Sequence, residues 1–256
     1  MNGSTAIRID ESAIAREARR QLKESPARIV LRQAWSEFLL SWRKSVRFRW
    51  TENARAVRAY CEMSVEEFEG INARQRWSDW RTIPRNISGR LPDSPCRAVD
   101  LCSGLGHSTQ VLAYYLPAGS KILGLEYNSR FVETAALREY RRRDGRPAEV
   151  SFSAQSVLES FRDPSGRLLP DSSVDLVNSC GALGVHFDPP AIERIVAETA
   201  RILKEGGLAT IDSGTRGVPP AEMRRLFSKR GFVTLGSTRS CVFDRYVHIC
   251  FRKNRP

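Results

Sequence analysis

No hydrophobic run in the sequence is long enough to cross a membrane, and the first residues lack the apolar centre of a secretory signal peptide. We therefore expect a cytoplasmic protein. Histidine is scarce, with three residues in 256, and the six cysteines form no Cys-x-x-Cys pair. Because zinc sites need cysteine or histidine ligands at short spacings, the sequence predicts neither a metal site nor a disulfide framework.

Acidic residues are outnumbered, 29 against 41 basic residues, which gives a net charge of +12. Such an excess favours nucleic acid as a partner, and residues 42–50 interleave cations with aromatics as single-strand binders do. The charge is nevertheless spread along the chain, with +7 in residues 1–90 and +5 in residues 91–256. Neither part is a distinct basic arm, so RNA or DNA binding is an alternative and not the main prediction.

A glycine turn is the most informative motif. A strand-like run over residues 96–100 ends in Asp100, and a turn with Gly104 and Gly106 leads into a helical pattern over residues 107–116. Glycine allows a sharp turn and a close approach of backbone N–H groups to a ligand. An ordinary strand-to-helix turn is the alternative, but the carboxyl end of such a strand is where open α/β sheets bind ligands. The motif predicts a nucleotide-like cofactor.

A second buried strand over residues 121–126 completes a β–α–β unit. It ends in Glu126, about twenty residues after the glycine turn. Because a carboxylate accepts strong hydrogen bonds, an acid at this place suits the two hydroxyls of a ribose. A solvated acid at the end of a strand is the alternative interpretation.

The remaining pattern predicts a doubly wound, mostly parallel α/β sheet of the Rossmann-like kind. The last two strand-like runs have no room for a helix between them and should form an antiparallel hairpin. The expected helices are 131–142, 191–203 and 222–230, and the expected strands are 150–155, 174–180, 208–212, 232–237 and 246–252.

Four places together carry a family resemblance. They are Asp-Leu-Cys-Ser-Gly-Leu-Gly at 100–106, Glu126, Asn-Ser-Cys-Gly at 178–181, and Ile-Leu-Lys-Glu-Gly-Gly-Leu at 202–208. In this order and spacing they resemble the class I S-adenosylmethionine-dependent methyltransferases, over about residues 91–256. The resemblance implies a seven-stranded sheet that ends in a reversed hairpin.

The glycine motif departs from the family at one place, because Cys102 stands where the family has its first glycine. We expect this change to be tolerated. A nicotinamide-binding fold fits less well, since its fingerprint has glycine or alanine where Thr109 stands, and its sheet rarely ends in such a hairpin.

The resemblance implies S-adenosylmethionine as the cofactor and S-adenosylhomocysteine as its product. The glycines would pack against the methionine part, Asp100 would order the loop or meet the amino group, and Glu126 would bind both ribose hydroxyls. Gln155 matches the place that contacts adenine, although a polar strand end in solvent would look the same. The implied cofactor residues are Asp100, Ser103, Gly104, Gly106, Glu126, Tyr127, Gln155, Ser156 and Asn178.

Methyl transfer needs alignment and exclusion of water, and it needs a base only when the acceptor must lose a proton. His186, on the loop after the fourth strand, is the candidate base, because an unperturbed histidine has a pKa of about 6.5. A packing histidine is the alternative. Cys180 lies where some cytosine methyltransferases place a nucleophile, but without the usual proline, so we expect a buried thiol.

The first ninety residues carry all five tryptophans and helical apolar stripes. We expect residues 1–90 to form a helical cap over the cofactor mouth of a methyltransferase core at 91–256. In the family such segments shape the acceptor pocket, so Trp77, Trp80 and Arg81 are the candidate pocket residues; tryptophans that only join the helices to the sheet are the alternative. The two stripes are Ile14, Ala18 and Leu22, and Val30 or Leu31 with Trp35, Phe38, Leu39 and Trp42.

The sequence thus predicts methyl transfer from S-adenosylmethionine to a small-molecule or natural-product-like acceptor. An RNA methyltransferase that uses the basic N-terminal region is the first alternative. A cofactor-binding protein without catalysis is the second, since no general base is obvious.

Overall fold

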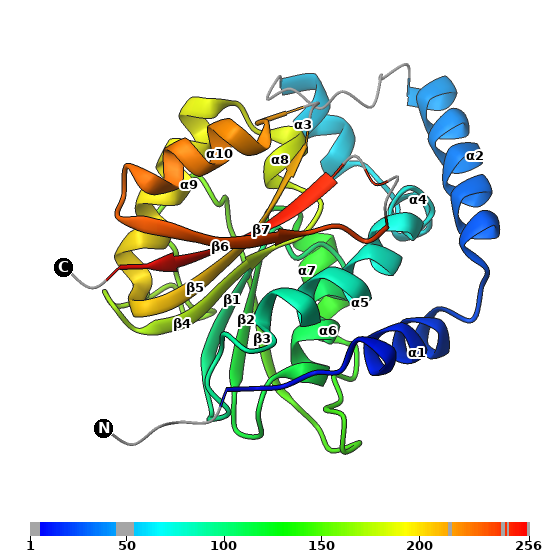
Figure 1. The fold of residues 1–256 in the computed structure, drawn as a ribbon. Helices are drawn as coiled ribbons and strands as arrows, with labels where there is room; N and C mark the ends of the chain where they lie inside the picture. The colour runs from blue at the N-terminus through cyan, green and yellow to red at the C-terminus, as the bar shows by residue number, and fades with distance from the viewer. Residues whose placement is uncertain (1–5, 45–53, 215–216, 242–243, 245, 255–256) are drawn as a thin grey trace.

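The computed structural model describes residues 6–44, 54–214, 217–241, 244 and 246–254. The basic and aromatic run at 42–50 therefore lies outside the described residues from position 45 onward. Helices flank a central sheet on both sides (Figure 1). Ahead of the sheet lie α1 (Glu11–Leu22), α2 (Pro26–Lys44), α3 (Ala54–Cys61), α4 (Val65–Ile71) and α5 (Ala73–Ile87).

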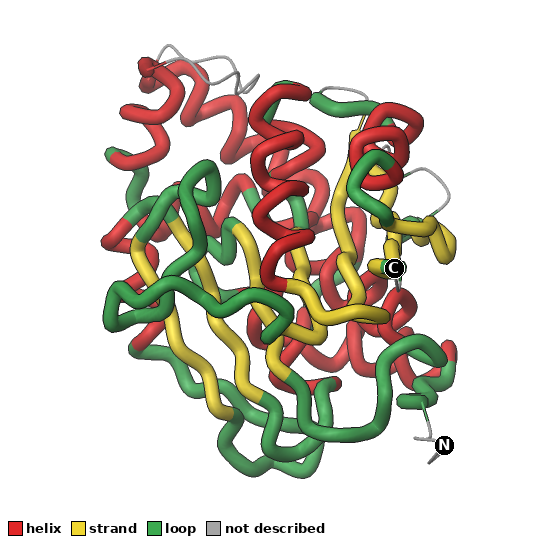
Figure 2. The backbone as a smooth tube through the Cα atoms, turned by 90° about the vertical axis from the view of Figure 1, so that its left-hand side faces the viewer, coloured by secondary structure: helices red, strands yellow, loops and turns green. Residues whose placement is uncertain are grey.

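The sheet has seven strands in the order β3-β2-β1-β4-β5-β7-β6. Parallel pairing joins β3, β2, β1, β4 and β5, whereas β7 is antiparallel to both of its neighbours. The predicted fold class, with its reversed hairpin, is confirmed. Figure 2 shows the strands side by side with helices around them. The strands are β1 (Arg97–Leu101), β2 (Lys121–Glu126), β3 (Glu149–Ala154), β4 (Val174–Ser179), β5 (Leu203–Gly214), β6 (Phe232–Thr238) and β7 (Tyr246–Lys253).

The helices that connect the strands are α6 (His107–Tyr115), α7 (Ser129–Ala136), α8 (Leu183–His186), α9 (Pro189–Ile202) and α10 (Pro220–Ser228). Three of them, α6, α9 and α10, agree with the sequence pattern, whereas α7 ends early and the short α8 was expected as a loop. The helix α9 begins with Asp188 as its N-cap, because the side chain of Asp188 accepts a hydrogen bond from the N–H of Ala191 at 2.9 Å. No helix in the described residues is both long and apolar enough to cross a membrane.

The helix predicted over residues 131–142 was wrong at its end, because α7 stops at Ala136. Beyond it, Tyr140 turns back and donates a hydrogen bond to the carbonyl of Ala135 at 2.9 Å, with its ring packed 5.6 Å from that of Phe152. Burial of this tyrosine against β3 outweighs the helical propensity of the arginine-rich segment that follows. β5 is also longer than predicted, since its pairing with β7 continues to Gly214.

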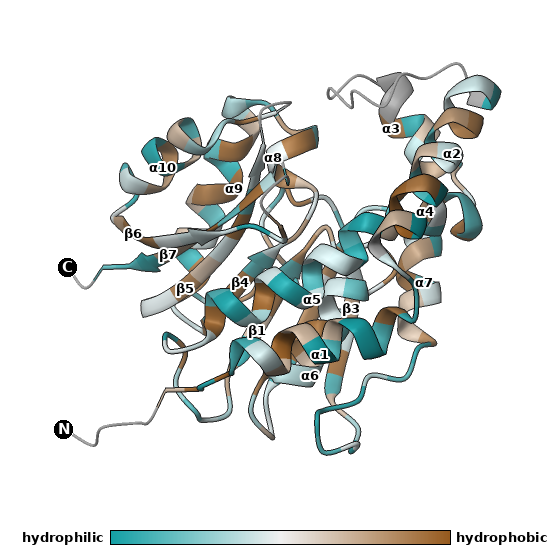
Figure 3. Ribbon diagram, turned by 45° about the vertical axis from the view of Figure 1, so that its right-hand side comes forward, coloured by the Kyte–Doolittle hydropathy of each residue, from teal (hydrophilic) through white to brown (hydrophobic). Residues whose placement is uncertain are grey.

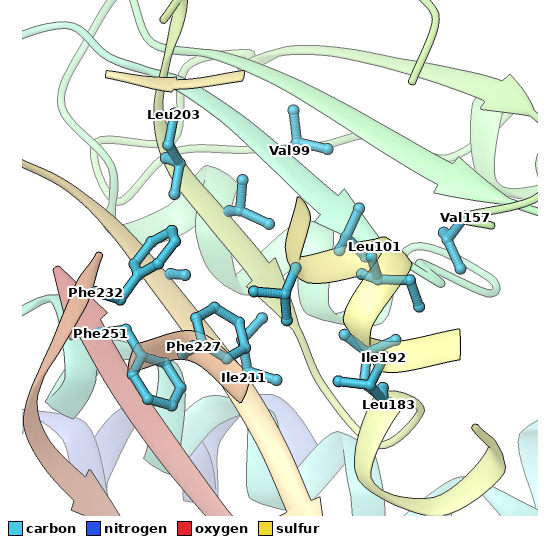
Figure 4. Packing of buried hydrophobic residues seen from close by; sticks show 14 of the residues in the cluster. Val99, Leu101, Val157, Leu183, Ile192, Leu203, Ile211, Phe227, Phe232 and Phe251 are labelled. Carbon is cyan, nitrogen blue, oxygen red and sulfur yellow. The ribbon is translucent and has the colours of Figure 1, made fainter. Parts of the chain in front are cut away.

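Two hydrophobic clusters fill the two sides of the sheet. On one side Leu101, Ile211 and Phe251 meet α9 and α10, and Phe227 stacks on Phe251 at 4.0 Å (Figure 4). On the other side Ile83 of α5 packs with α6 and with alternate strand residues. This alternation is what a sheet covered on both faces requires. α1 and α5 thus share a core with the sheet, and the boundary near residue 90 stays a prediction.

The second apolar stripe of the N-terminal region is mostly exposed and does not pack onto the sheet. In α2 the buried hydrophobic residues are Ile29 and Leu40, whereas Trp42 is 74% exposed. The helix packs on α4 and α5 through its opposite side, so most of the stripe faces solvent. The exposed members are Val30, Leu31, Trp35, Phe38 and Trp42. In the first stripe, Ile14 and Ala18 are buried as predicted.

Candidate cofactor and acceptor site

The glycine turn lies where the carboxyl end of β1 meets α6. Gly104 and Gly106 have φ values of +53° and +78°, in the left-handed region that favours glycine. A Cβ atom on Gly104 would lie 2.7 Å from the ring of Phe68, which leaves no room for a side chain. Cys102 also has a positive φ, 54°, so the backbone takes the family's turn at this place without a glycine.

Asp100 anchors this turn to the sheet. Its fully buried carboxylate accepts hydrogen bonds from Ser108 Oγ at 2.7 Å and Thr109 Oγ1 at 2.6 Å, and from Asn178 Nδ2 at 2.7 Å. The Thr210 hydroxyl in turn donates to Asn178 Oδ1 at 2.7 Å. Burial raises the pKa of Asp100, and the three donors oppose that rise. The contacts support the loop-ordering role that the sequence left open, and they bring Asp100 and Asn178 together.

Glu126 ends β2 with its side chain 2% exposed. The N–H of Gly104 donates to Oε2 at 2.9 Å, and Oε1 accepts from the N–H of Asn128 at 2.8 Å and from the Tyr60 hydroxyl at 3.0 Å. Burial raises the pKa of Glu126, but three converging donors favour the charged form. The carboxylate and the glycine turn are therefore one unit.

Two aromatic residues of the N-terminal helices close over this unit. The hydroxyl of Tyr60 in α3 donates a hydrogen bond to the carboxylate. Burial and the nearby carboxylate raise the pKa of Tyr60, so its hydroxyl stays neutral and can donate. Phe68 of α4 covers Gly104 and packs 4.6 Å from Phe131. Two hollows in the described residues lie elsewhere, one beside β3 and one beside Arg81. Sequence analysis missed both aromatics, because a helical aromatic gives the same signal as a core residue.

The remaining predicted cofactor residues lie around this edge, and their contact with a cofactor stays a prediction. Ser103 has a buried hydroxyl with no hydrogen-bond partner in the described structure. Gln155 binds its own loop, since its amide donates to the carbonyl of Arg162 at 2.7 Å and accepts from the N–H of that residue at 3.0 Å. The hydroxyl of Ser156 accepts a hydrogen bond from the backbone N–H two residues further along the chain. Tyr127 is 54% exposed. A role for Gln155 at adenine requires this loop to release its amide.

These residues fit a nucleoside cofactor with an amino-acid tail. A buried carboxylate that already holds a hydroxyl is suited to a ribose diol, and a turn without side chains is suited to close backbone contact. The unpaired Ser103 hydroxyl is a further polar atom for a ligand to satisfy. Tyr60 and Phe68 occupy the places that such a ligand would need, so the fit requires α3 and α4 to move.

A second buried polar cluster lies beside the carboxyl ends of β4 and β5. Asp79 of α5 accepts a hydrogen bond from Gln75 Nε2 at 2.7 Å, and the Sγ of Cys180 is 3.5 Å from the ring of His248. A Cβ atom on Gly181 would lie 2.6 Å from the Gln75 side chain. Burial raises the pKa of Asp79 to about 7, which suits a proton acceptor at neutral pH. Sequence analysis missed Asp79, because an acid on an amphipathic helix normally faces solvent.

The predicted catalytic and pocket residues lie in different surroundings. His186 ends α8, and burial lowers its pKa to about 4, so it is neutral at pH 7 and a weak base; its catalytic role stays a prediction. Trp80 is packed in the core with its ring 5.3 Å from that of Tyr114, which fits the alternative that the tryptophans join the helices to the sheet; its place in an acceptor pocket stays a prediction. Arg81 stacks on Trp77 at 4.6 Å, on the half-buried surface of α5.

The Cys180 thiol is buried, which raises its pKa well above the usual range, in agreement with an inert thiol.

Asp79→Asn should change how stability depends on pH. Burial raises the carboxyl from its ordinary pKa of 3.8 to about 7, so the folded state holds the proton more tightly than the unfolded state. The stabilising effect of this proton is complete below pH 4 and is lost as the pH rises through 7. That loss corresponds to about 4 kcal/mol in the wild type and is absent in the variant.

Urea unfolding at pH 4, 6 and 8 measures this difference, with Asp93→Asn, an exposed aspartate away from the site, as the control. The stability of Asp79→Asn relative to wild type should increase steadily from pH 4 to pH 8. A difference independent of pH would show that Asp79 titrates normally.

Comparisons with known proteins identify a domain family and the fold. Residues 98–207 match the model of a methyltransferase domain family. A TehB-like S-adenosylmethionine-dependent methyltransferase from Corynebacterium glutamicum is 16% identical and covers 77% of this chain and 100% of its own, with a TM-score of 0.55. A chain in the complex of the Haloferax volcanii Trm112 methyltransferase activator with a methyltransferase is 18% identical and covers 75% and 95%, with a TM-score of 0.56.

An arsenic(III) S-adenosylmethionine methyltransferase from Chlamydomonas reinhardtii is 18% identical, and the match spans 62% of this chain and 64% of that one, with a TM-score of 0.48. No curated protein matches the sequence significantly. At these identities the solved structures establish the fold alone.

Proposed function

Because residues 98–207 match a methyltransferase domain family and the sheet has the methyltransferase topology, we propose that the protein methylates a small-molecule acceptor at the carboxyl edge of its sheet. The observation that supports this most is the Glu126 carboxylate, which the Gly104 N–H holds in place while a hydroxyl group is bound to it. This is the arrangement that a ribose diol needs. Asp100 joins the turn to the neighbouring strand β4, because its carboxylate accepts a hydrogen bond from that strand.

When bound, S-adenosylmethionine supplies a methyl carbon that its sulfonium already activates, so the protein's tasks are binding, alignment and exclusion of water. Glu126 would hold the ribose, and the turn at Gly104 and Gly106 would lie against the methionine part. Asp79 would take the proton that an acceptor hydroxyl or amine loses. His186, with its lowered pKa, is the weaker candidate for that step.

Cofactor entry would require displacement of the α3–α4 segment. Tyr60 would release the carboxylate to the ribose, and Phe68 would leave the glycine turn. After that movement the same residues can close over the bound molecule and keep water out. The segment would therefore act as a cover whose two positions compete for Glu126.

A small acceptor is favoured over RNA by the way this edge is covered. α4 and α5 lie across it through Phe68 and Gln75, which leaves less open surface for a polynucleotide than an uncovered edge would offer. RNA stays the second candidate because of the excess of basic residues in the sequence.

Transfer of a radiolabelled methyl group tests the proposal. The protein is incubated with labelled S-adenosylmethionine and either a panel of small hydroxyl, amine and thiol compounds or bulk RNA. Label is expected in the small-molecule fraction, and Asp79→Asn should lower kcat while leaving S-adenosylhomocysteine affinity unchanged. Label found only in RNA would favour the second candidate, and cofactor binding without any transfer would favour a non-catalytic protein.

A further inference from the structure

The outer face of α2 is an exposed apolar stripe. Leu31, Trp35, Phe38 and Trp42 follow one another at helical spacing and are 71%, 62%, 59% and 74% exposed. They extend over about 16 Å of helix and present roughly 600 Å² of largely apolar surface. Figures 1 and 3 show α2 at the periphery, on the far side of α4 from the sheet. A patch of this size on a surface marks an interaction site.

The orientation of α2 is set by its polar side. Gln33 Oε1 accepts a hydrogen bond from the N–H of Arg74 in α5 at 2.8 Å. A Cβ atom on Gly70 would lie 2.6 Å from Ser36 Oγ, so α2 and α4 approach closely at small residues. Because the helix packs inward through Ile29, Leu40 and these polar and small residues, its aromatic side remains available for a partner.

The exposed charges of α2 beside the stripe are basic, although one of them, Arg32, pairs with Glu24 ahead of the helix at 3.4 Å. Arg28, Arg32 and Arg43 are exposed, and no acidic residue is exposed among the described side chains of α2. Its one acid, Glu37, is half-buried and accepts a hydrogen bond from Gln33. Aromatic and aliphatic residues with flanking arginines are the composition of helices that lie in a membrane interface.

Two other occupants agree less well with these observations. In a symmetric pair of chains the stripe offers less than the roughly 800 Å² per partner of a standard interface, and it brings like-charged arginines together. For single-stranded RNA each aromatic should present a free face to a base, but Trp35 and Phe38 stack on each other, with centroids 5.7 Å apart and planes 27° apart.

We propose that the outer face of α2 docks on an anionic phospholipid surface. Leu31, Trp35, Phe38 and Trp42 enter the boundary between headgroups and acyl chains, while the three arginines contact lipid phosphates. The proposal is independent of methyl transfer, since α2 contributes no residue to the Glu126 unit. Docking would hold the carboxyl edge of the sheet near the membrane.

Co-sedimentation of the full chain with vesicles tests the proposal. Vesicles of phosphatidylcholine with phosphatidylglycerol are compared with vesicles of phosphatidylcholine alone. The chain should bind the anionic vesicles preferentially, and Trp35→Ser/Trp42→Ser should lower the partition coefficient by at least about tenfold. Arg28→Glu/Arg43→Glu should reduce only the anionic preference.

The control is Leu137→Ser, which removes an exposed leucine elsewhere and should leave vesicle binding unchanged. All variants should keep the wild-type melting temperature and S-adenosylhomocysteine affinity, because the changed side chains are exposed. Failure to bind anionic vesicles would overturn the proposal. So would binding that survives the double tryptophan change, a stripe-dependent dimer in sedimentation without vesicle binding, or stripe-dependent binding of an RNA oligonucleotide alone.

Discussion

Glu126→Gln is expected to weaken S-adenosylhomocysteine binding by more than about tenfold, because hydrogen bonds to a charged group contribute about 1.5 to 3 kcal/mol. Glutamine keeps the shape of the side chain and one acceptor oxygen, but it loses the charge and the second acceptor. Gly104 and Asn128 then compete for the remaining oxygen, and the ribose diol loses its acceptor. Isothermal titration calorimetry measures the change directly.

The matched control is Glu133→Gln, an exposed glutamate on the neighbouring helix α7, which should bind like wild type. Thermal unfolding of both variants separates loss of the ligand contact from loss of the fold. If Glu126→Gln stayed folded and bound the ligand with unchanged affinity, the carboxylate would not be the ribose site.

Tyr60→Phe should have the opposite effect and tighten S-adenosylhomocysteine binding by up to about tenfold. The Tyr60 hydroxyl occupies Glu126 Oε1, so the ligand must first break that hydrogen bond. Phenylalanine keeps the ring contact with Phe131 and removes only the competing donor. The closed state loses stability while the ligand-bound state does not, which shifts the population toward binding.

Tyr114→Phe is the control, because Tyr114 also places its hydroxyl on a carboxylate, that of Glu17, but away from the glycine turn. It should leave the affinity unchanged. Weaker binding by Tyr60→Phe would mean that the hydroxyl contacts the bound ligand instead of competing with it. Hydrogen exchange of residues 54–71 should increase in Tyr60→Phe without ligand if the cover is loosened.

The fold was predictable because its signals are local. The glycine turn, the acid at the end of the second strand and the missing helix before residue 246 each constrain one connection, and together they leave one topology. The end of α7 was not predictable, because Tyr140 is drawn out of a helical segment by a contact with Phe152 that is formed only in the folded chain.

The positions of the candidate residues could be predicted where they follow strands of the sheet. They could not be predicted where they lie on the helices that cover the sheet edge. Asp100 and Glu126 follow from their positions at strand ends, whereas Tyr60 and Asp79 come from helices whose contact with the sheet edge no local pattern encodes. The exposure of the stripe on α2 could not be predicted for a related reason. An amphipathic pattern shows that one face is apolar but does not show whether the molecule itself covers that face.

Calorimetric titration of the unmodified protein with S-adenosylhomocysteine, beside NAD, tests the central claim most directly. A carboxylate and glycine turn of this kind should bind S-adenosylhomocysteine in the micromolar range once the α3–α4 segment moves, and NAD should produce no measurable heat. Absence of S-adenosylhomocysteine binding, or tighter binding of NAD, would contradict the assignment of this edge as a methyl-donor site.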